Sequence, residues 1–91
     1  MGVDLVPRNR AVDLPHYNWS GWRTLDNLTS VELAGSNDGD YLSAADCRAI
    51  AQDIETQASD YNNAFAGDYY GPNPALEHAK AFRECRGCWQ W

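Results

Sequence analysis

The chain has 91 residues, of which 44% are hydrophobic, and a formal net charge of −6 at neutral pH. This length suits one domain, spanning residues 1–91, with a single modest core and no deep enclosed cleft. The acidic balance argues against direct binding to nucleic acid, which requires a basic surface. No apolar run approaches the length of a membrane span, and the first residues lack the pattern of a signal peptide. We therefore expect a cytoplasmic protein that contacts no membrane.

The first predicted element is a short strand over residues 3–5, where apolar and polar residues alternate. Residues 8–18 are expected to form an irregular connection. A first helix is predicted over residues 19–33, because tryptophan and leucine side chains recur there at helical spacing. Its N-cap is expected to be Asn18 or Ser20, since either side chain can accept a hydrogen bond from the first helical turn.

The segment Gly35–Asp46 resembles the calcium loop of an EF-hand in its spacing of Asn, Asp and Gly residues. Two of the required carboxylates are missing in either possible register, so a true EF-hand site is not expected. These residue types instead favour a compact turn. Ser43, followed three residues later by Asp46, resembles a capping box. We therefore expect a turn that leads into a capped helix.

A second helix is predicted to begin after Ser43 and to end near residue 61. Its expected buried stripe consists of Cys47, Ile50, Ala51, Ile54 and Ala58. Residues 59–74 are predicted to form a loop, because they are rich in Gly, Pro, Asn and Asp. This loop is unusual in carrying four aromatic side chains.

A third helix is predicted to begin at Pro74, which suits a first helical turn, and to end at Gly87. The side chains expected to point inward are Leu76, Ala79 and Phe82. Residues 88–91 alternate in character and are expected to form a strand beside the N-terminal one. The predicted fold is therefore mainly α (α+β), with three short helices and a minor two-stranded ribbon that joins the N- and C-terminal strands.

Several blocks of the sequence resemble a family of small uncharacterised bacterial and phage proteins. These blocks are Met1–Asp4, Asn18–Trp22, Gly35–Asp40 with Cys47, and Cys85–Cys88. The resemblance covers both ends and the middle of the chain but not residues 59–74. It supplies no catalytic residues. It implies that the blocks belong together and that the protein originates from a mobile element.

The negative charge is concentrated in the central third of the chain. Residues 35–70 contain seven acidic residues against Arg48, a net charge of −6, whereas residues 1–34 carry −1 and residues 71–91 carry +1. Such an acidic strip suits a basic partner surface, including the nucleic-acid channel of another protein; the alternative is a solvated face that aids solubility. Aromatic residues in loops often anchor partners. The predicted partner-binding residues are Asp38, Asp40, Asp53, Asp60, Asp68, Tyr61, Phe65, Tyr69 and Tyr70.

The cysteines raise the alternative of a metal-stabilised structural module. Cys85 and Cys88 have the spacing of half a zinc site, and Cys47 could add a third thiolate. His78 or His16 would complete such a set. Complete zinc patterns carry two paired motifs, however, and a buried cysteine often serves only as a small apolar residue. Weak calcium binding at the Gly35–Asp46 loop is a further alternative, and no cofactor is assigned.

An enzyme would have to use His16 or His78 as its base. No nucleophile elbow, phosphate loop or metalloprotease motif accompanies either histidine. The sequence therefore predicts a small acidic, non-enzymatic protein-binding domain. With the phage resemblance, the more specific hypothesis is an inhibitor of a host nucleic-acid-handling protein, of the anti-defence or anti-CRISPR type. A small-molecule enzyme remains the third alternative.

Overall fold

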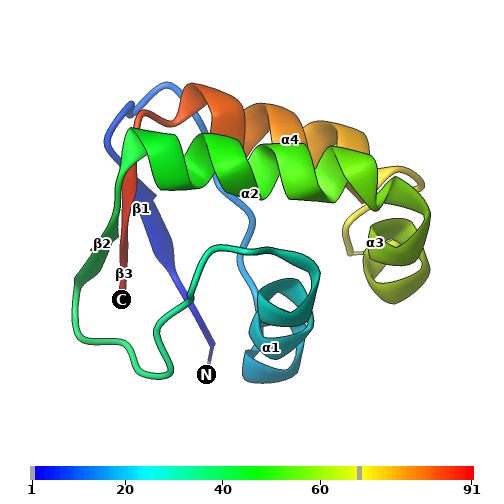
Figure 1. Ribbon diagram of the computed structural model, residues 1–91, viewed down its shortest axis with the longest axis horizontal. Coiled ribbons are helices and arrows are strands. Elements are labelled where there is room, and N and C mark those ends of the chain that lie inside the picture. Colours follow the sequence, from blue (N-terminus) through cyan, green and yellow to red (C-terminus); the bar gives the residue numbers. More distant parts are fainter. Residues whose placement is uncertain (1, 68) are drawn as a thin grey trace.

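A computed structural model describes residues 2–67 and 69–91, which form four helices and a three-stranded sheet (Figure 1). In chain order the elements are β1 (Leu5–Pro7), α1 (Trp19–Leu28), β2 (Asp40–Leu42), α2 (Ala44–Thr56), α3 (Ala58–Phe65), α4 (Pro74–Glu84) and β3 (Cys88–Gln90). The α+β class is confirmed, but one helix and one strand more than predicted are present. No helix in the described residues combines the length and apolarity that crossing a membrane requires.

The sheet has the strand order β1-β3-β2, with both pairs antiparallel. Val6 in β1 lies opposite Trp89 in β3, so the predicted pairing of the two ends of the chain is confirmed. Tyr41 in β2 lies on the other side of Trp89. The sequence does not predict β2, because this three-residue strand directly follows a run of turn residues. The central strand is therefore the last one in the chain.

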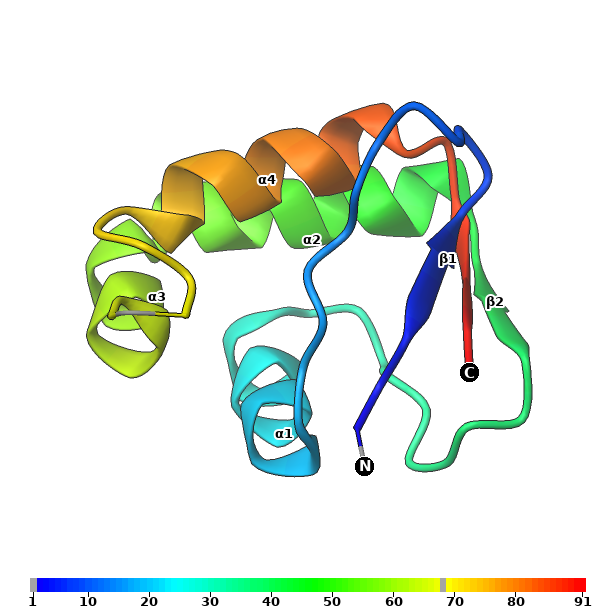
Figure 2. The same ribbon diagram turned by 180° about the vertical axis from the view of Figure 1, so that it is seen from behind.

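α2 and α4 run side by side in opposite directions above one end of the sheet (Figures 1 and 2). Ser43 caps α2 as predicted, since its Oγ accepts a hydrogen bond from the Asp46 N–H at 3.1 Å. Asn73 caps α4, and Pro74 occupies its first turn. The buried faces of the two helices consist of Cys47, Ile50, Ala51 and Ile54 from α2, and Pro74, Ala75, His78, Ala79 and Phe82 from α4.

α1 ends at Leu28 rather than at residue 33 as predicted. Thr29 is extended, with φ −110° and ψ 151°. A carboxylate oxygen of Asp53, on α2, accepts hydrogen bonds from the Thr29 hydroxyl at 2.8 Å and the Ser30 N–H at 2.9 Å. The Asp53 carboxylate thus satisfies the Ser30 N–H without a further helical turn. Because this partner lies on another helix, the local sequence predicts a helix that is too long.

The prediction that residues 59–65 form a loop is wrong, because they belong to α3. The second helix stops at Thr56, where Gln57 leaves the helical conformation and donates through Nε2 to the Leu28 carbonyl at 2.6 Å. α3 then begins in a new direction. The inward position predicted for Leu76 is also wrong, since this side chain is 68% exposed. The buried stripe of α4 instead starts at Ala75 and repeats at helical spacing, which leaves Leu76 outside.

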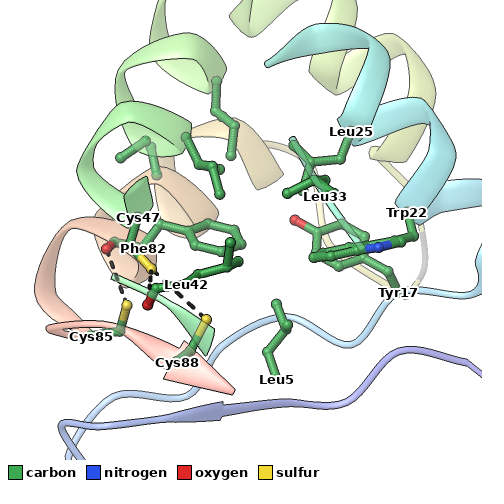
Figure 3. Packing of buried hydrophobic residues seen from close by; sticks show 14 of the residues in the cluster. Leu5, Tyr17, Trp22, Leu25, Leu33, Leu42, Cys47, Phe82, Cys85 and Cys88 are labelled. Carbon is green, nitrogen blue, oxygen red and sulfur yellow. Dashed lines mark hydrogen bonds between the residues drawn. The ribbon is translucent and has the colours of Figure 1, made fainter. Parts of the chain in front are cut away.

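The core has two chemically different ends (Figure 3). Near the sheet, the three cysteines are all fully buried. Near α1, aromatic rings dominate: Tyr17 and Trp22 lie with their ring centroids 5.7 Å apart. Trp22 belongs to this core, because it is only 3% exposed.

Candidate functional site

One face of the sheet is solvent-exposed and carries aromatic side chains. Successive residues of a strand point to opposite faces, and in β3 Cys88 and Gln90 are buried whereas Trp89 is half-buried. Tyr41 packs beside Trp89 with ring centroids 5.1 Å apart and is 44% exposed, and Trp91 is 55% exposed. We call this surface the outer sheet face; it consists of Asp4, Val6, Tyr41, Trp89 and Trp91.

Trp91 lies between Asp4 and the acidic turn around Gly39. Asp4 and Trp91 exchange two backbone hydrogen bonds, of 2.9 and 2.8 Å, so their side chains project from the same face. On the other side the indole lies against Gly39, where a Cβ atom would be 2.6 Å from Cη2 of the ring. The exposed residues Asp38 and Asp40 flank this glycine in the chain. The exposed ring thus has Asp4 on one side and the acidic turn Asp38–Asp40 on the other. Asp40 is paired with Gln90, so its side chain projects from the opposite face of the sheet.

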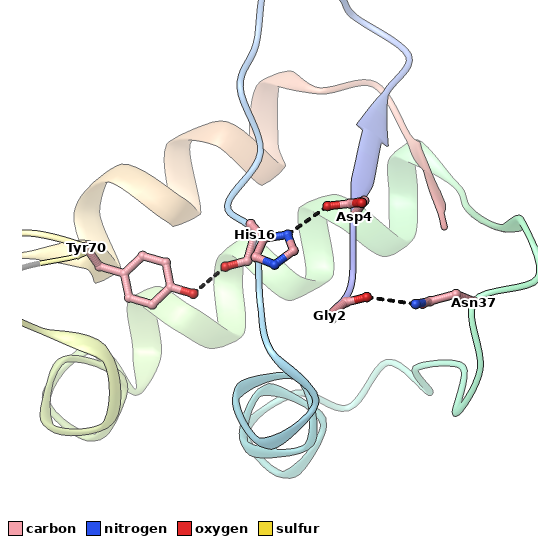
Figure 4. Close-up of polar contacts among 5 residues, drawn as sticks. All are labelled: Gly2, Asp4, His16, Asn37 and Tyr70. Carbon is pink, nitrogen blue, oxygen red and sulfur yellow. Dashed lines mark hydrogen bonds and ion pairs between the residues drawn. The ribbon is translucent and has the colours of Figure 1, made fainter.

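The calcium-like loop is held to the sheet by a side-chain amide. Nε2 of the buried Gln90 donates to the carbonyl oxygens of Ala34 and Ser36 and to Oδ1 of Asn37, at 3.1 to 3.2 Å. Asn37 in turn donates to the Gly2 carbonyl at 2.8 Å (Figure 4). The three converging oxygens therefore already have a donor, and none of them is a carboxylate. In the loop for which the sequence raised the alternative of weak calcium binding, these oxygens are therefore bound by the Gln90 amide.

The other predicted acidic residues do not join this face. Asp53 faces the end of α1. Burial alone would raise its pKa, but hydrogen bonds from the Ser30 N–H and the Thr29 and Ser30 hydroxyls lower it below the ordinary value. Asp60 is on α3, at the opposite end of α2 from β2 (Figure 1). Asp68 lies outside the described residues. The acidic third of the sequence is therefore not one continuous strip in space.

Two of the four predicted aromatic contacts are buried. Tyr61 is 0% and Phe65 8% exposed, because α3 turns both rings into the core. Tyr70 packs on Phe65 and donates its hydroxyl to the His16 carbonyl (Figure 4). Tyr69 is 74% exposed and lines an open groove of about 480 Å³ between α1 and the segment after α3. Only this residue keeps the exposure that the predicted binding role requires.

Neither histidine has the surroundings of an assembled catalytic site. His16 Nδ1 lies 2.7 Å from Asp4 Oδ1, an exposed pair (Figure 4). Such a carboxylate can orient an imidazole. The Thr24 hydroxyl, which lines the groove together with His16, donates to the Ser20 carbonyl at 3.0 Å and not to the imidazole. The other histidine is buried in the core.

His78 ends a chain of buried hydroxyl groups. The Tyr17 and Tyr61 hydroxyl oxygens are 2.5 Å apart, and the Tyr61 oxygen is 2.5 Å from His78 Nδ1. Burial lowers the pKa of His78 to about 4 and raises the pKa values of both tyrosines. All three groups are therefore neutral near pH 7. The Tyr61 hydroxyl is hydrogen-bonded to both the imidazole and the Tyr17 hydroxyl, so this network satisfies polar atoms inside the core.

The three cysteines gather where α2, α4 and β3 meet. The Cys47 and Cys88 Sγ atoms are 3.8 Å apart, and Cys85 Sγ lies 3.2 Å from the Phe82 carbonyl oxygen (Figure 3). His78 lies two helical turns before Cys85 and is hydrogen-bonded to Tyr61 of α3. The predicted set of three cysteines and a histidine is therefore not assembled. Within residues 2–67 and 69–91, no group of three or more His, Cys, Asp or Glu side chains is arranged to hold a metal ion.

Tyr41, Trp89 and Trp91 were not among the predicted partner-binding residues. The alternation of residues 88–91 contains the necessary signal, because it places Trp89 and Trp91 on the same face of a strand. Only the unpredicted strand β2 brings Tyr41 beside Trp89.

Comparison with models of protein families, with curated proteins and with solved structures finds no match for this chain. The resemblance of its sequence blocks to small phage and bacterial proteins therefore stays a prediction.

Proposed function

We propose that this chain is a small protein-binding domain, and that its outer sheet face binds a basic segment of a partner protein. The observation that carries this proposal is the position of Trp91, an exposed indole that pairs with Asp4 in the sheet and packs on Gly39, between the exposed residues Asp38 and Asp40 of the chain. A guanidinium or ammonium group is attracted to the face of an indole and forms charge-assisted hydrogen bonds with carboxylates. Aromatic residues are also frequent binding hot spots.

Charged residues of opposite sign lie at the two ends of the outer sheet face. The three aspartates lie at the Trp91 end of β3, whereas Arg86 precedes the other end of this strand and Arg8 follows β1 at that same end. A basic segment should therefore place its cations near Trp91 and any acidic group near the arginines. Such polarity contributes more to partner choice and association rate than to affinity itself.

A basic channel that normally holds nucleic acid presents the same chemistry as such a segment. On this ground we retain the more specific proposal of an inhibitor of a host nucleic-acid-handling protein, in which the acidic residues compete with phosphates. The predicted aromatic loop has no part in this version, because Tyr61 and Phe65 are buried.

The test uses an arginine-rich peptide as the probe and a glutamate-rich peptide of equal length as its control, with binding measured by isothermal titration calorimetry. The double variant Asp38→Asn, Asp40→Asn should weaken binding of the basic peptide about tenfold, as expected for two lost ion pairs near a protein surface. The double variant Asp60→Asn, Glu77→Gln makes the same change in net charge at exposed positions elsewhere and should weaken it less than about twofold.

Trp91→Ala separates site binding from general charge attraction. This variant keeps the net charge, so it should reduce affinity only if the indole takes part. Equal losses in the two charge variants, together with unchanged binding by Trp91→Ala, would show that the peptide binds the acidic protein without using this face. That result would overturn the proposal.

A further inference from the structure

The thiols of Cys47 and Cys88 touch each other in the core, behind the outer sheet face. Their sulfur atoms are 3.8 Å apart (Figure 3). Cys47 lies in the first turns of α2 and Cys88 opens β3, so the contact joins two elements that are 41 positions apart in the sequence. Both side chains are fully buried. Two thiols held in contact by two rigid elements are positioned to react with each other rather than with a distant group.

Cys85 is the competing partner for Cys88, because the two have the spacing of many redox motifs. Its thiol donates to the Phe82 carbonyl of its own helix at 3.2 Å, a closer contact than the 3.9 Å between the Cys47 sulfur and the Leu42 carbonyl oxygen. The residues between the two cysteines, Arg86 and Gly87, have φ values of 62° and 107° and reverse the chain.

We propose that Cys47 and Cys88 are an oxidative cross-linking site, which forms an intramolecular disulfide when the protein meets a peroxide. One sulfur attacks the O–O bond of hydrogen peroxide, becomes a sulfenic acid and releases one water molecule. The second sulfur attacks the sulfenic sulfur, the S–O bond breaks, and a second water molecule leaves. The two thiols together lose two electrons, which reduce the peroxide, and their two protons leave in the water.

The product cross-links α2 to the central strand of the sheet. Bond formation requires the sulfur atoms to approach from 3.8 Å to about 2.05 Å. Since the bond closes a long loop of the unfolded chain, the disulfide should raise the melting temperature by about 10 °C or more. A thiol reductant should return the melting temperature to its original value.

The test compares oxidation of the folded and the unfolded chain. Hydrogen peroxide is added to the native protein and, separately, to the protein in concentrated urea, and each product is digested and mapped by mass spectrometry. The native protein should yield the Cys47–Cys88 peptide pair. The unfolded chain should instead favour Cys85–Cys88, because the shortest loop closes most readily.

Two variants complete the experiment. Cys85→Ser removes the competing thiol and should retain both the native cross-link and the rise in melting temperature. Cys88→Ser should lose both. A native product that is mainly Cys85–Cys88 would overturn the proposal, and so would a native protein that forms no disulfide under conditions that oxidise the unfolded chain.

Discussion

Acidification should destabilise this protein through His78, because its imidazole is buried and hydrogen-bonded to the Tyr61 hydroxyl. In the unfolded chain this histidine has an ordinary pKa near 6.5, whereas burial lowers the pKa to about 4 in the folded protein. Between these values the unfolded chain binds a proton that the folded protein does not. Stability is therefore fully present above about pH 6.5 and falls as the pH decreases toward 4.

The magnitude follows from the difference between the two pKa values. Complete protonation of the unfolded chain, with the folded protein still neutral, corresponds to a loss of about 3 kcal/mol at the limit. At pH 5 about 2 kcal/mol of this loss should already be present. That is a large fraction of the typical stability of a small domain, which is roughly 5 to 15 kcal/mol.

Urea unfolding at pH 7, 6 and 5, monitored by circular dichroism, measures this loss. His78→Gln serves as the comparison, because it removes the titrating group while keeping a polar side chain of similar length. The variant is expected to be less stable at pH 7 but to show a much flatter dependence on pH than the parent. A parent whose free energy of unfolding changes by less than about 0.5 kcal/mol between pH 7 and 5 would refute the assignment. Equal pH dependence in parent and variant would refute it as well.

Two further substitutions test the contacts that fix the loops. Asp53→Asn should lower the free energy of unfolding by about 1 kcal/mol, because the partly solvated carboxylate binds Thr29 and Ser30. It should also remove a stability loss that the parent shows below about pH 4, since the pKa of Asp53 is lowered in the folded state; urea unfolding at pH 7 and 3.5 checks both effects. Gln90→Leu should cost about 2 kcal/mol, because it leaves the Ser36 and Asn37 oxygens without this donor, whereas the Ala34 carbonyl keeps the Trp22 indole N–H. Thermal and urea unfolding measure this loss, and an effect below about 0.5 kcal/mol would show that solvent replaces the amide.

The features that the sequence predicts correctly depend on residues close together in the chain. Ser43 is followed at once by the apolar stripe of α2, and Pro74 stands at the start of another helical pattern. Capping and the shape of proline act within a single turn, so they can be recognised without a tertiary structure. The pairing of the two terminal strands is the exception, and it follows from alternation at both ends of the chain.

The features that the sequence does not predict depend on distant partners. Tyr61 and its neighbouring asparagines are typical of loops. Tyr61 is nevertheless buried, because its hydroxyl is hydrogen-bonded to the Tyr17 hydroxyl and to His78 Nδ1. α1 stops early because Asp53 reaches it from another helix. A local pattern cannot show that a polar group finds its partner 17 or 44 positions away. The error concerning the aromatic loop arises from this limit.

Gln90 and Trp91 show how one strand can both hold a loop and display a binding group. Because successive residues point to opposite faces, Gln90 turns inward to hold the oxygens of residues 34–37, while Trp91 turns outward onto Gly39. Asp38, Gly39 and Asp40 lie directly after the segment that Gln90 holds, so the position of this acidic turn against Trp91 depends on this buried amide. A loop fixed before binding loses less conformational entropy when a partner arrives. The loop that resembles a calcium site thus uses an amide from its own chain where an EF-hand uses an ion, and its carboxylates face outward instead of inward.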